Sequence, residues 1–291
     1  MTGVALIGLG EVGRVIAEDL SGSAPGSAPG SVSAWDTAFG DGNSPASRNA
    51  AALGLSPGSS AAEGIAGARV IFSAVTAANT LRAAEAAAEG IAPKAWYVDL
   101  NSASPGQKVA AAAVIEQAGG RYVEAAVMSP IHPRRLAAPV LLGGPHAAGF
   151  EPVGADLGWT RLEVYSDRIG PAAATKLARS VVVKGLEALV TESMLTARAW
   201  GVEDYVLGSL SNVIPVPDWP AFAQYLVSRA VQHGTRRAEE MREAAETVAA
   251  SGVTPWLASA TAERQDWAGQ FDLADPAEDL FSLIDRMRAT A

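Results

Sequence analysis

The sequence predicts an α/β fold in which a doubly wound parallel sheet is followed by an all-α C-terminal domain. Three observations support this prediction. Short apolar runs alternate with Ala-rich helical runs in the first half of the chain, which is typical of βαβ units. A glycine-rich turn follows the first apolar run, and the second half shows apolar residues at helical spacing. We place the boundary near residue 168, which gives domains 1–168 and 169–291.

The expected strands are apolar runs of strand length, and their near-continuous apolar character suits a sheet that is buried on both faces. These runs are Val4–Ile7, Val32–Trp35, Val70–Val75, Trp96–Leu100, Tyr122–Met128, Val140–Leu142 and Thr160–Val164. The helices expected between them include Val12–Leu20, Asn79–Glu89 and Gln107–Gln117. The tract Ser21–Ser31 reads SGSAPGSAPGS, and this composition predicts a surface loop to which we assign no function.

The second half begins with a long helical stretch, Ala172–Trp200, which would be about 43 Å long at 1.5 Å per residue. A Pro-punctuated segment, IPVPDWP, follows it at 214–220. Further helices are expected at Ala221–Ala250, Pro255–Trp267 and about Pro276–Met287. The second half is therefore expected to be all-helical.

Composition narrows the class of protein. The 291 residues are 49% hydrophobic and 18% charged, as in an ordinary globular protein that can bury a core. The formal net charge of -9 argues against binding to nucleic acid or to an anionic membrane. The absence of cysteine excludes disulfides and thiolate chemistry, and the three histidines lack the spacing of metal ligands, so we expect no metal. The N-terminus lacks the features of a signal peptide and no apolar run is long enough to span a bilayer, so we expect a cytoplasmic protein.

The segment GLGEVG, residues 8–13, has the spacing G-x-G-x-x-G between the first strand and an expected helix, which is the context that a Rossmann-type dinucleotide site requires. Gly8 permits the tight turn, Gly10 lets the backbone approach a pyrophosphate, and Gly13 lets the helix and strand pack closely. The carboxylate of Glu11 would have to point outward. The residues expected to contact the cofactor are Gly8, Leu9, Gly10, Glu11, Val12, Gly13, Asp36, Val75 and Thr76.

Asp36 distinguishes the two nicotinamide dinucleotides. It ends the second strand, 23 residues after Gly13, close to the spacing at which a carboxylate accepts hydrogen bonds from the ribose hydroxyls. A carboxylate there would repel a 2′-phosphate, so NAD is favoured over NADP. Two alternatives remain open: Asp36 starts a turn, or Arg48 downstream serves the 2′-phosphate of NADP.

Two loops at the ends of later strands carry groups that could hold a substrate. The first, DLNSASP at 99–105, offers the amide of Asn101 and the hydroxyl of Ser102, although a serine before Pro105 also suits a simple helix cap. The second, MSPIHPRR at 128–135, offers Ser129 and His132, and its two arginines could meet a carboxylate. The alternative for the second is an exposed Pro-rich loop with solvated arginines.

Lys176 is the candidate for proton transfer. Only four lysines occur in the chain, and Lys176 stands in an Ala-rich helix. The small alanine side chains around it would let another molecule or segment approach its amine closely. Burial would lower its pKa toward the range of a working acid and base, which arginine cannot reach. Ser180 lies one turn further on the same face, and Lys184 lies about 80° away around the helix axis. From spacing alone, a surface lysine is an equal alternative for Lys176, and Lys184 is expected to be structural or solvated.

In this order, the motifs resemble those of the β-hydroxyacid dehydrogenase family, which includes 6-phosphogluconate and 3-hydroxyisobutyrate dehydrogenases. The family's glycine motif is matched at 8–13, its D-x-S-T-x-x-P motif in part by DLNSASP at 99–105, its D-A-P-V-S-G-G loop loosely by EAAVMSP at 124–130, and its lysine helix by GPAAATKLARS at 170–180. The sequence departs from the family at Asn101-Ser102, at Ser129-Pro130 and at Ser180, which replaces an asparagine. The tail at 233–248 is similar to a divergent branch with a C-terminal domain of unknown function.

The resemblance implies an NAD(P)-dependent oxidoreductase that transfers a hydride between the cofactor and a small hydroxyacid or a related alcohol or carbonyl compound. It assigns general acid and base chemistry to Lys176. It assigns substrate binding to Asn101, Ser102, Ser129, His132 and Ser180, with His233, Arg236, Arg237 and Asn212 as further candidates in the helical domain. It also implies a homodimer formed through that domain. The alternatives are an imine reductase, a related group that usually lacks this lysine, and a non-catalytic dinucleotide-binding or interaction protein.

Overall fold

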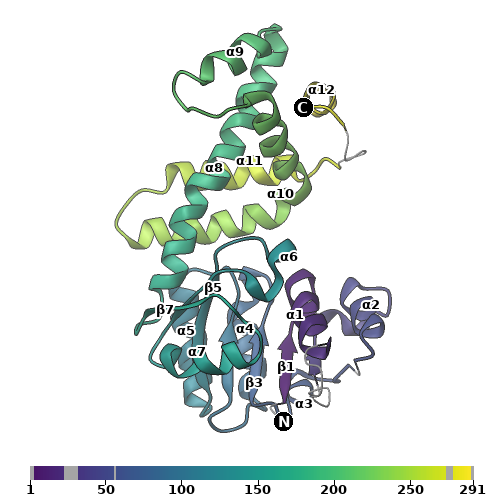
Figure 1. The fold of residues 1–291 in the computed structure, drawn as a ribbon, viewed down its shortest axis with the longest axis vertical. Helices are drawn as coiled ribbons and strands as arrows, with labels where there is room; N and C mark the ends of the chain where they lie inside the picture. The colour runs from purple at the N-terminus through teal and green to yellow at the C-terminus, as the bar shows by residue number, and fades with distance from the viewer. Residues whose placement is uncertain (1–2, 23–31, 56, 273–277, 290–291) are drawn as a thin grey trace. The chain divides into compact units, whose positions relative to one another are not determined.

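The computed structural model describes residues 3–22, 32–55, 57–272 and 278–289, and most of the Ser21–Ser31 tract lies outside them. The chain forms two compact units, Met1–Lys176 and Leu177–Ala291, which we call the sheet unit and the helical unit (Figure 1). Helix α8, Pro171–Trp200, begins in the sheet unit and continues in the helical unit.

The sheet unit contains a seven-stranded sheet in the order β2-β1-β3-β4-β5-β6-β7. The strands are β1 (Val4–Ile7), β2 (Val32–Trp35), β3 (Val70–Ser73), β4 (Trp96–Asp99), β5 (Arg121–Val127), β6 (Val140–Gly143) and β7 (Leu162–Ser166). All seven expected strands are confirmed, with ends that shift by no more than two residues.

One pair of strands differs from the expected parallel sheet, because β5 and β6 are antiparallel. A parallel connection needs a crossover that usually contains a full helix. The connection between these strands holds only the short helix α6, Ile131–Arg134, and one 3-10 turn. The sheet is therefore mostly, but not wholly, parallel.

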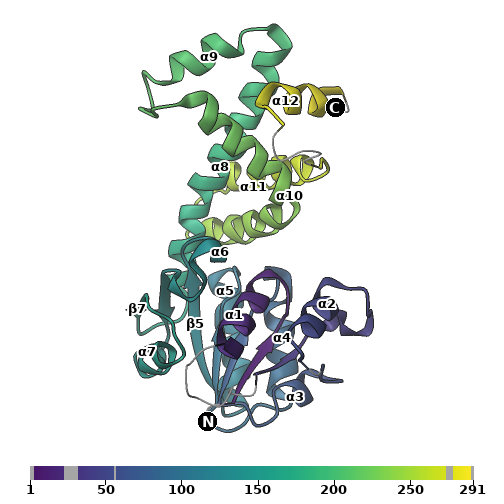
Figure 2. The same ribbon diagram turned by 45° about the vertical axis from the view of Figure 1, so that its right-hand side comes forward.

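Helices cover both faces of the sheet, as a doubly wound fold requires (Figure 2). Successive residues of β1 alternate between two cores, with Leu6 in one and Ile7 in the other. One core includes residues of α1 (Glu11–Gly22), α2 (Pro45–Ala52) and α7 (Ala147–Asp156). The other is built against α4 (Thr80–Ala88) and α5 (Pro105–Gln117), near the short α3 (Ala61–Gly64).

The helical unit contains the rest of α8 with α9 (Glu203–Leu210), α10 (Trp219–Ala250), α11 (Trp256–Ala268) and α12 (Leu280–Ala289). Its main core is formed by side chains from all five helices, including Met194, Leu226 and Ile284. Helices α10 and α11 approach closely at Gly234, where a Cβ atom would lie 2.3 Å from the carbonyl oxygen of Gln265. In the part of the chain that the structure describes, no helix combines the length and apolar character needed to cross a membrane.

Candidate active site

Four turns that the sequence singled out lie at one edge of the sheet. Strands β1, β3, β4 and β5 are adjacent and parallel, so their carboxyl ends share that edge. The chain runs from β1 to β2 on one side and then to β3 on the other side, which makes the crevice beyond β1 and β3 a topological switch point. Ligands of open α/β sheets bind at such a point.

The three glycines of the first turn are required for different reasons. Gly8 has φ 92°, and a Cβ atom there would lie 2.4 Å from the carbonyl oxygen of Ala74. A Cβ atom on Gly13 would lie 2.0 Å from the carbonyl oxygen of Gly8, so the protein backbone excludes a side chain at both positions. Gly10 is exposed and a Cβ atom there would meet no protein atom within 4 Å. The fold does not account for Gly10, whereas a ligand that approaches the backbone at the N-terminus of α1 would.

The other residues of this turn divide between the core and the surface. Leu9 is fully buried, so only its backbone is available to a cofactor. Glu11 is exposed, as a dinucleotide site requires of it, and Val12 packs partly against the core. The turn therefore presents mainly backbone groups, which fits a phosphate ligand.

Asp36 lies beside the glycine turn. Its carboxylate accepts hydrogen bonds from the N–H of Leu9 at 2.9 Å and from the N–H of Ala38 at 2.9 Å. It therefore starts a turn and also contacts the glycine turn, while its role toward a ribose stays a prediction. Asn49, which the sequence did not single out, donates from Nδ2 to the carbonyl oxygen of Leu9 at 2.8 Å. The exposed Arg48 donates to the carbonyl oxygen of Asn43.

Asn101 joins the turns after β3 and β4. Its Oδ1 accepts from the N–H of Val75 at 2.7 Å, its Nδ2 donates to Oγ of Ser73 at 3.0 Å, and the residue is buried. The structure thus brings Asn101 and Val75 together and uses the Asn101 amide inside the protein. Ser102 is half-buried beside it, and Thr76 is exposed. Ser104, not Ser102, occupies the N-cap position of α5.

The loop after β5 is anchored to α1. Arg135 pairs with Glu18 at 3.0 Å and with Asp19 at 2.7 Å, so it is not a freely solvated arginine. Ser129 is half-buried and its hydroxyl donates to the carbonyl oxygen of Pro130 at 3.1 Å. His132 is exposed. Of the loop's candidates, Ser129 and His132 remain available to a substrate.

A buried polar network that the sequence did not reveal lies behind this edge. Lys108 donates to Oδ1 of Asp99 at 2.8 Å, and the hydroxyl of Tyr122 donates to Oδ2 at 2.6 Å. Burial raises the pKa of Tyr122 well above its usual value, so it stays a proton donor. Glu124, also fully buried, accepts hydrogen bonds from the backbone at the start of α8. Carboxylates inside otherwise apolar strands were the only signal of this network.

Lys176 lies in the second turn of α8 and is half-buried. It is the last residue of the sheet unit, so it belongs to the same compact unit as the glycine turn. Its predicted role stays a prediction, as do those of the other candidate site residues.

Ser180 and Lys184 belong to the helical unit. Lys184 is buried, donates to Oγ of Ser180 at 3.0 Å and pairs with Glu240, so it is structural and not solvated. Burial lowers the pKa of Lys184, against the opposing effect of Glu240. Three of the four further candidates contact other side chains of the helical unit. Arg236 pairs with Glu240, Arg237 pairs with Glu187, and His233 contacts Arg229. The fourth, Asn212, is exposed.

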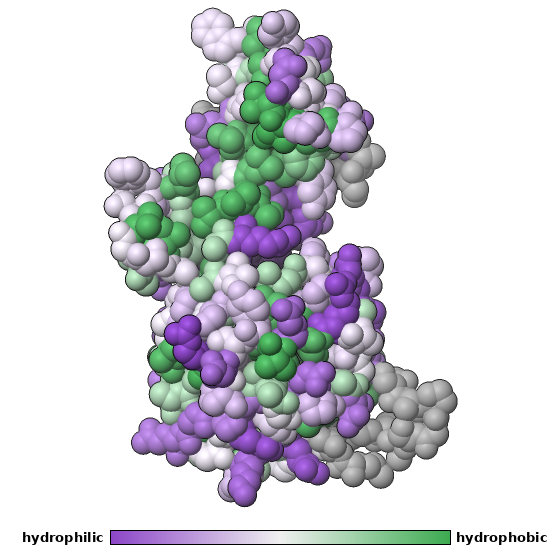
Figure 3. Space-filling view, turned by 60° about the vertical axis from the view of Figure 1, so that its left-hand side comes forward, coloured by the Kyte–Doolittle hydropathy of each residue, from purple (hydrophilic) through white to green (hydrophobic). Residues whose placement is uncertain are grey.

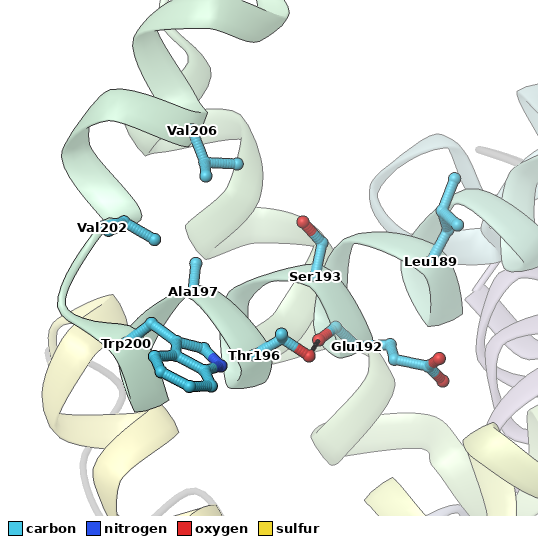
Figure 4. A pocket seen from close by; sticks show the side chains of 8 residues that line it. All are labelled: Leu189, Glu192, Ser193, Thr196, Ala197, Trp200, Val202 and Val206. Carbon is cyan, nitrogen blue, oxygen red and sulfur yellow. Dashed lines mark hydrogen bonds between the residues drawn. The ribbon is translucent and has the colours of Figure 1, made fainter.

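The helical unit also carries an open pocket with a mostly apolar lining, formed by the end of α8 and the start of α9 (Figure 4). Its lining residues are Leu189, Glu192, Ser193, Thr196, Ala197, Trp200, Val202 and Val206. No group of three His, Asp or Glu side chains among the described residues could hold a metal ion.

Comparison with known proteins agrees with this architecture. Residues 3–150 match the NAD binding domain of 6-phosphogluconate dehydrogenase, and residues 197–268 match a domain of unknown function, DUF1932. No curated protein matches the sequence.

Solved structures similar to the chain include a conserved hypothetical protein from Sinorhizobium meliloti, with 34% identity, a TM-score of 0.73 and coverage of 100% of this chain and 97% of that one. The 3-hydroxyisobutyrate dehydrogenase of Mycobacterium tuberculosis, solved with L-serine, is 20% identical over 99% of both chains, with a TM-score of 0.71. A reductive aminase from Aspergillus terreus, solved with NADPH and ethyl levulinate, is 20% identical over 99% of this chain and 100% of that one, with a TM-score of 0.57.

Proposed function

The chain belongs to the family defined by the NAD binding domain of 6-phosphogluconate dehydrogenase, and on this premise we propose that it is an NAD(P)-dependent dehydrogenase or reductase. Its substrate would be a small hydroxyacid or a related alcohol or carbonyl compound. The observation that carries the proposal is that Lys176 and the glycine turn belong to one compact unit, with Gly10 left open to a ligand.

The residues at the sheet edge suit a dinucleotide. The backbone of residues 8–13 and the N-terminus of α1 would hold the pyrophosphate, and Asp36, already hydrogen-bonded to Leu9, would accept from the ribose hydroxyls. The negative charge of Asp36 favours NAD over NADP. When bound, the nicotinamide ring supplies the hydride acceptor or donor.

Lys176 would exchange the proton that accompanies hydride transfer. In the oxidative direction its amine accepts the proton of the substrate hydroxyl, and in the reverse direction its ammonium donates that proton to the carbonyl oxygen. Ser102, Ser129 and His132 would orient the substrate, and Asn101 would hold the neighbouring turn in place through Val75 and Ser73. Ser180, one turn after Lys176 on α8, stays a further candidate for the substrate.

Replacing Lys176 with Ala tests this assignment. A general acid or base contributes about 10²–10⁴-fold to rate, so turnover of 3-hydroxyisobutyrate or L-serine with NAD should fall by that factor. Binding of NADH, measured by fluorescence titration, should be retained. Lys94→Asn is a matched control, because Lys94 is exposed with φ 63° and asparagine tolerates that backbone conformation. Unchanged turnover in K176A would refute the proposed role of the lysine.

Replacing Gly10 with Ala tests the dinucleotide site separately. The added methyl group meets no protein atom, so thermal stability should be unchanged while the Kd for NADH rises at least tenfold. Gly208→Ala in α9, which is also open, is the control. Equal NADH affinity in G10A and wild type would argue against this site.

Asp36 is tested by comparing the two cofactors. In the wild-type protein we expect NADH to bind more tightly than NADPH. The Asp36→Asn variant should narrow the difference between the two affinities.

We also propose a homodimer formed through the helical unit. Apolar side chains gather on one face of this unit (Figure 3), and Val182, Leu189 and Trp200 are exposed to 70%, 66% and 80%. Large exposed apolar patches mark interaction surfaces. Sedimentation analysis should show a dimer for the wild-type protein and a weaker dimer for Leu189→Glu. A wild-type protein that sediments as a monomer would rule out the proposed dimer.

A reductive role toward imines is the second candidate, because the fold also resembles that of the Aspergillus terreus reductive aminase. A panel of ketones with amines, assayed with NADH and NADPH, separates it from alcohol oxidation. The presence of Lys176 favours the alcohol substrate. A protein that binds NADH but turns over nothing in either panel would be a binding protein.

A further inference from the structure

A buried carboxylate from the sheet holds the beginning of α8. Oε2 of Glu124 accepts a hydrogen bond from the N–H of Gly170 at 2.7 Å, and Oε1 accepts one from the N–H of Ala173 at 2.6 Å. Gly170 directly precedes α8 and Ala173 lies in its first turn, where N–H groups have no intrahelical acceptor. A negative charge at this end of a helix also interacts favourably with the helix dipole. Glu124 therefore caps α8 with both carboxylate oxygens.

The neighbouring strand leaves space for this carboxylate. Glu124 of β5 pairs in register with Gly143 of β6, where an added Cβ atom would lie 2.4 Å from Oε2 of Glu124. Gly170, at φ 112°, turns the chain into α8 in a conformation that favours glycine. The site of the Glu124 side chain is thus bounded by β5, β6 and the first turn of α8.

Three α-helices elsewhere in the described part of the chain have local side-chain caps. Ser44, Ser60 and Asp218 each accept a hydrogen bond from the N–H three residues later, which stabilises a helix end but ties it to nothing else. Glu124 lies 46 and 49 residues before its two donors and stands on a central strand of the sheet. This cap therefore fixes the direction and rotation of the first turn of α8 relative to the sheet.

The network behind Glu124 makes its strand a firm support. Glu124 pairs in register with Asp99 of β4, and Asp99 is held by Lys108 and by Tyr122 of β5 itself. Burial raises the pKa of Glu124, while the charge of Lys108 and the N–H groups of Gly170 and Ala173 oppose that rise. The charge of Asp99 adds to the rise, so the carboxylate lies among donors, one cation and a second carboxylate.

Lys176 follows Ala173 by three residues, so the two lie on the same face of α8, one turn apart. We propose that Glu124 is a positioning residue for Lys176: by fixing the first turn of α8 to the sheet, it sets the direction in which the amine leaves the helix. This inference rests on the proposed function of Lys176. A displacement of about 1 Å at a reacting group can cost about 10²-fold in rate, so the loss of this cap should be visible in turnover.

The test replaces Glu124 with Gln, which keeps the shape but places an amide NH₂ against one of the two N–H donors. Turnover of 3-hydroxyisobutyrate with NAD should fall roughly 10- to 100-fold, while the Kd for NADH stays within about twofold of wild type. The pH profile of kcat should shift, because the surroundings of the Lys176 amine change. Glu116→Gln is the matched control, since the hydrogen-bond and ion-pair partners of Glu116 are the N–H of Tyr122 at 3.0 Å and His146 at 3.2 Å, neither of which lies in α8. It should leave all three measurements unchanged.

Two measurements make the result independent of turnover. Amide hydrogen exchange should speed up at 171–176 in E124Q and not in E116Q. Acetylation of Lys176 by acetic anhydride, followed by mass spectrometry over a pH series, should show altered reactivity of the amine in E124Q. Gly143→Ala, which displaces the Glu124 carboxylate without removing it, should reproduce these effects if E124Q does not fold.

Wild-type labelling of Lys176 and wild-type kcat in folded E124Q or G143A would overturn the positioning role. A fully active K176A would instead refute the proposed function of the lysine. In that case, the exchange and labelling data alone decide whether Glu124 orients it.

Discussion

The two units bury an ion pair in different ways. In the sheet unit, Lys108 and Asp99 are 1% and 0% exposed, and the backbone register of β4 and β5 brings Tyr122 to the same carboxylate. In the helical unit, Lys184 pairs with Glu240 across two helices, and the charges of Arg237 and Arg236 act against it.

The difference shows how each architecture supplies partners. In the sheet unit, Asp99 and its donor Tyr122 stand on adjacent strands and the cation comes from α5, whereas in the helical unit both charges come from facing helices. Among the described residues, both units bury polar atoms without a hydrogen-bond partner, such as Nε1 of Trp159 in the sheet unit and Nε of Arg237 in the helical unit. We therefore expect the Lys108 pair to contribute more to stability than the Lys184 pair.

The largest effect should come from Lys108→Met. The variant leaves Asp99 buried without its cation, and the loss of one partner of a buried pair costs about 3–5 kcal/mol. Urea unfolding of the full chain, followed by far-UV circular dichroism, measures this loss. If the free energy of unfolding falls by less than about 1 kcal/mol, the comparison between the units fails, because the Lys108–Asp99 pair would then stabilise the fold no more than an exposed pair.

The Lys184→Met variant should have a smaller effect, seen as a change in how the free energy of unfolding depends on pH. Burial lowers the pKa of Lys184 below its usual 10.5, so between that lowered pKa and 10.5 the unfolded chain binds more protons than the folded one. The free energy of unfolding therefore rises with pH in this window, by about 1.4 kcal/mol for each unit of lowering. Urea unfolding at several pH values up to 10.5 should show a steeper rise in wild type than in K184M. Identical slopes would mean that Lys184 is well solvated.

The smallest effect should come from Asp266→Asn. Its partner Arg242 and Asp266 itself are 55% and 48% exposed, and their N–O distance is 3.0 Å. Exposed pairs contribute less than about 1 kcal/mol, and salt screens them. The shift of the urea midpoint should be close to zero and should vanish in 0.5 M NaCl. A loss of stability comparable to that of K108M would show that burial does not determine which of these ion pairs stabilises the protein most.

Much of the fold follows from local pattern. The strands are apolar runs that end at turns, and the long helices α8 and α10 keep their helical spacing throughout. Helix α9, Glu203–Leu210, was not predicted, since it has only 8 residues and includes Gly208, so its stability comes from packing through Leu207. The antiparallel β6 was also missed, although the lack of a crossover helix before it was visible in the sequence.

The candidate site was predictable where a motif is local. The glycine turn and Lys176 can be proposed from the sequence because each motif fits within a dozen residues. Glu124 was missed as a helix cap because its donors lie 46 and 49 residues later, and no spacing rule connects a strand carboxylate to them. Lys184 was left undecided for a similar reason, as its partner Glu240 stands on another helix.

The boundary between the units falls directly after Lys176. The glycine turn, the carboxylate that caps α8 and the candidate amine thus lie in one compact unit, while the match to the domain of unknown function begins only at residue 197. In evolutionary terms, we expect that a lineage can replace or remodel the helical unit without changing the candidate amine. Relatives with unlike helical units and an unchanged first block are the expected trace of that history.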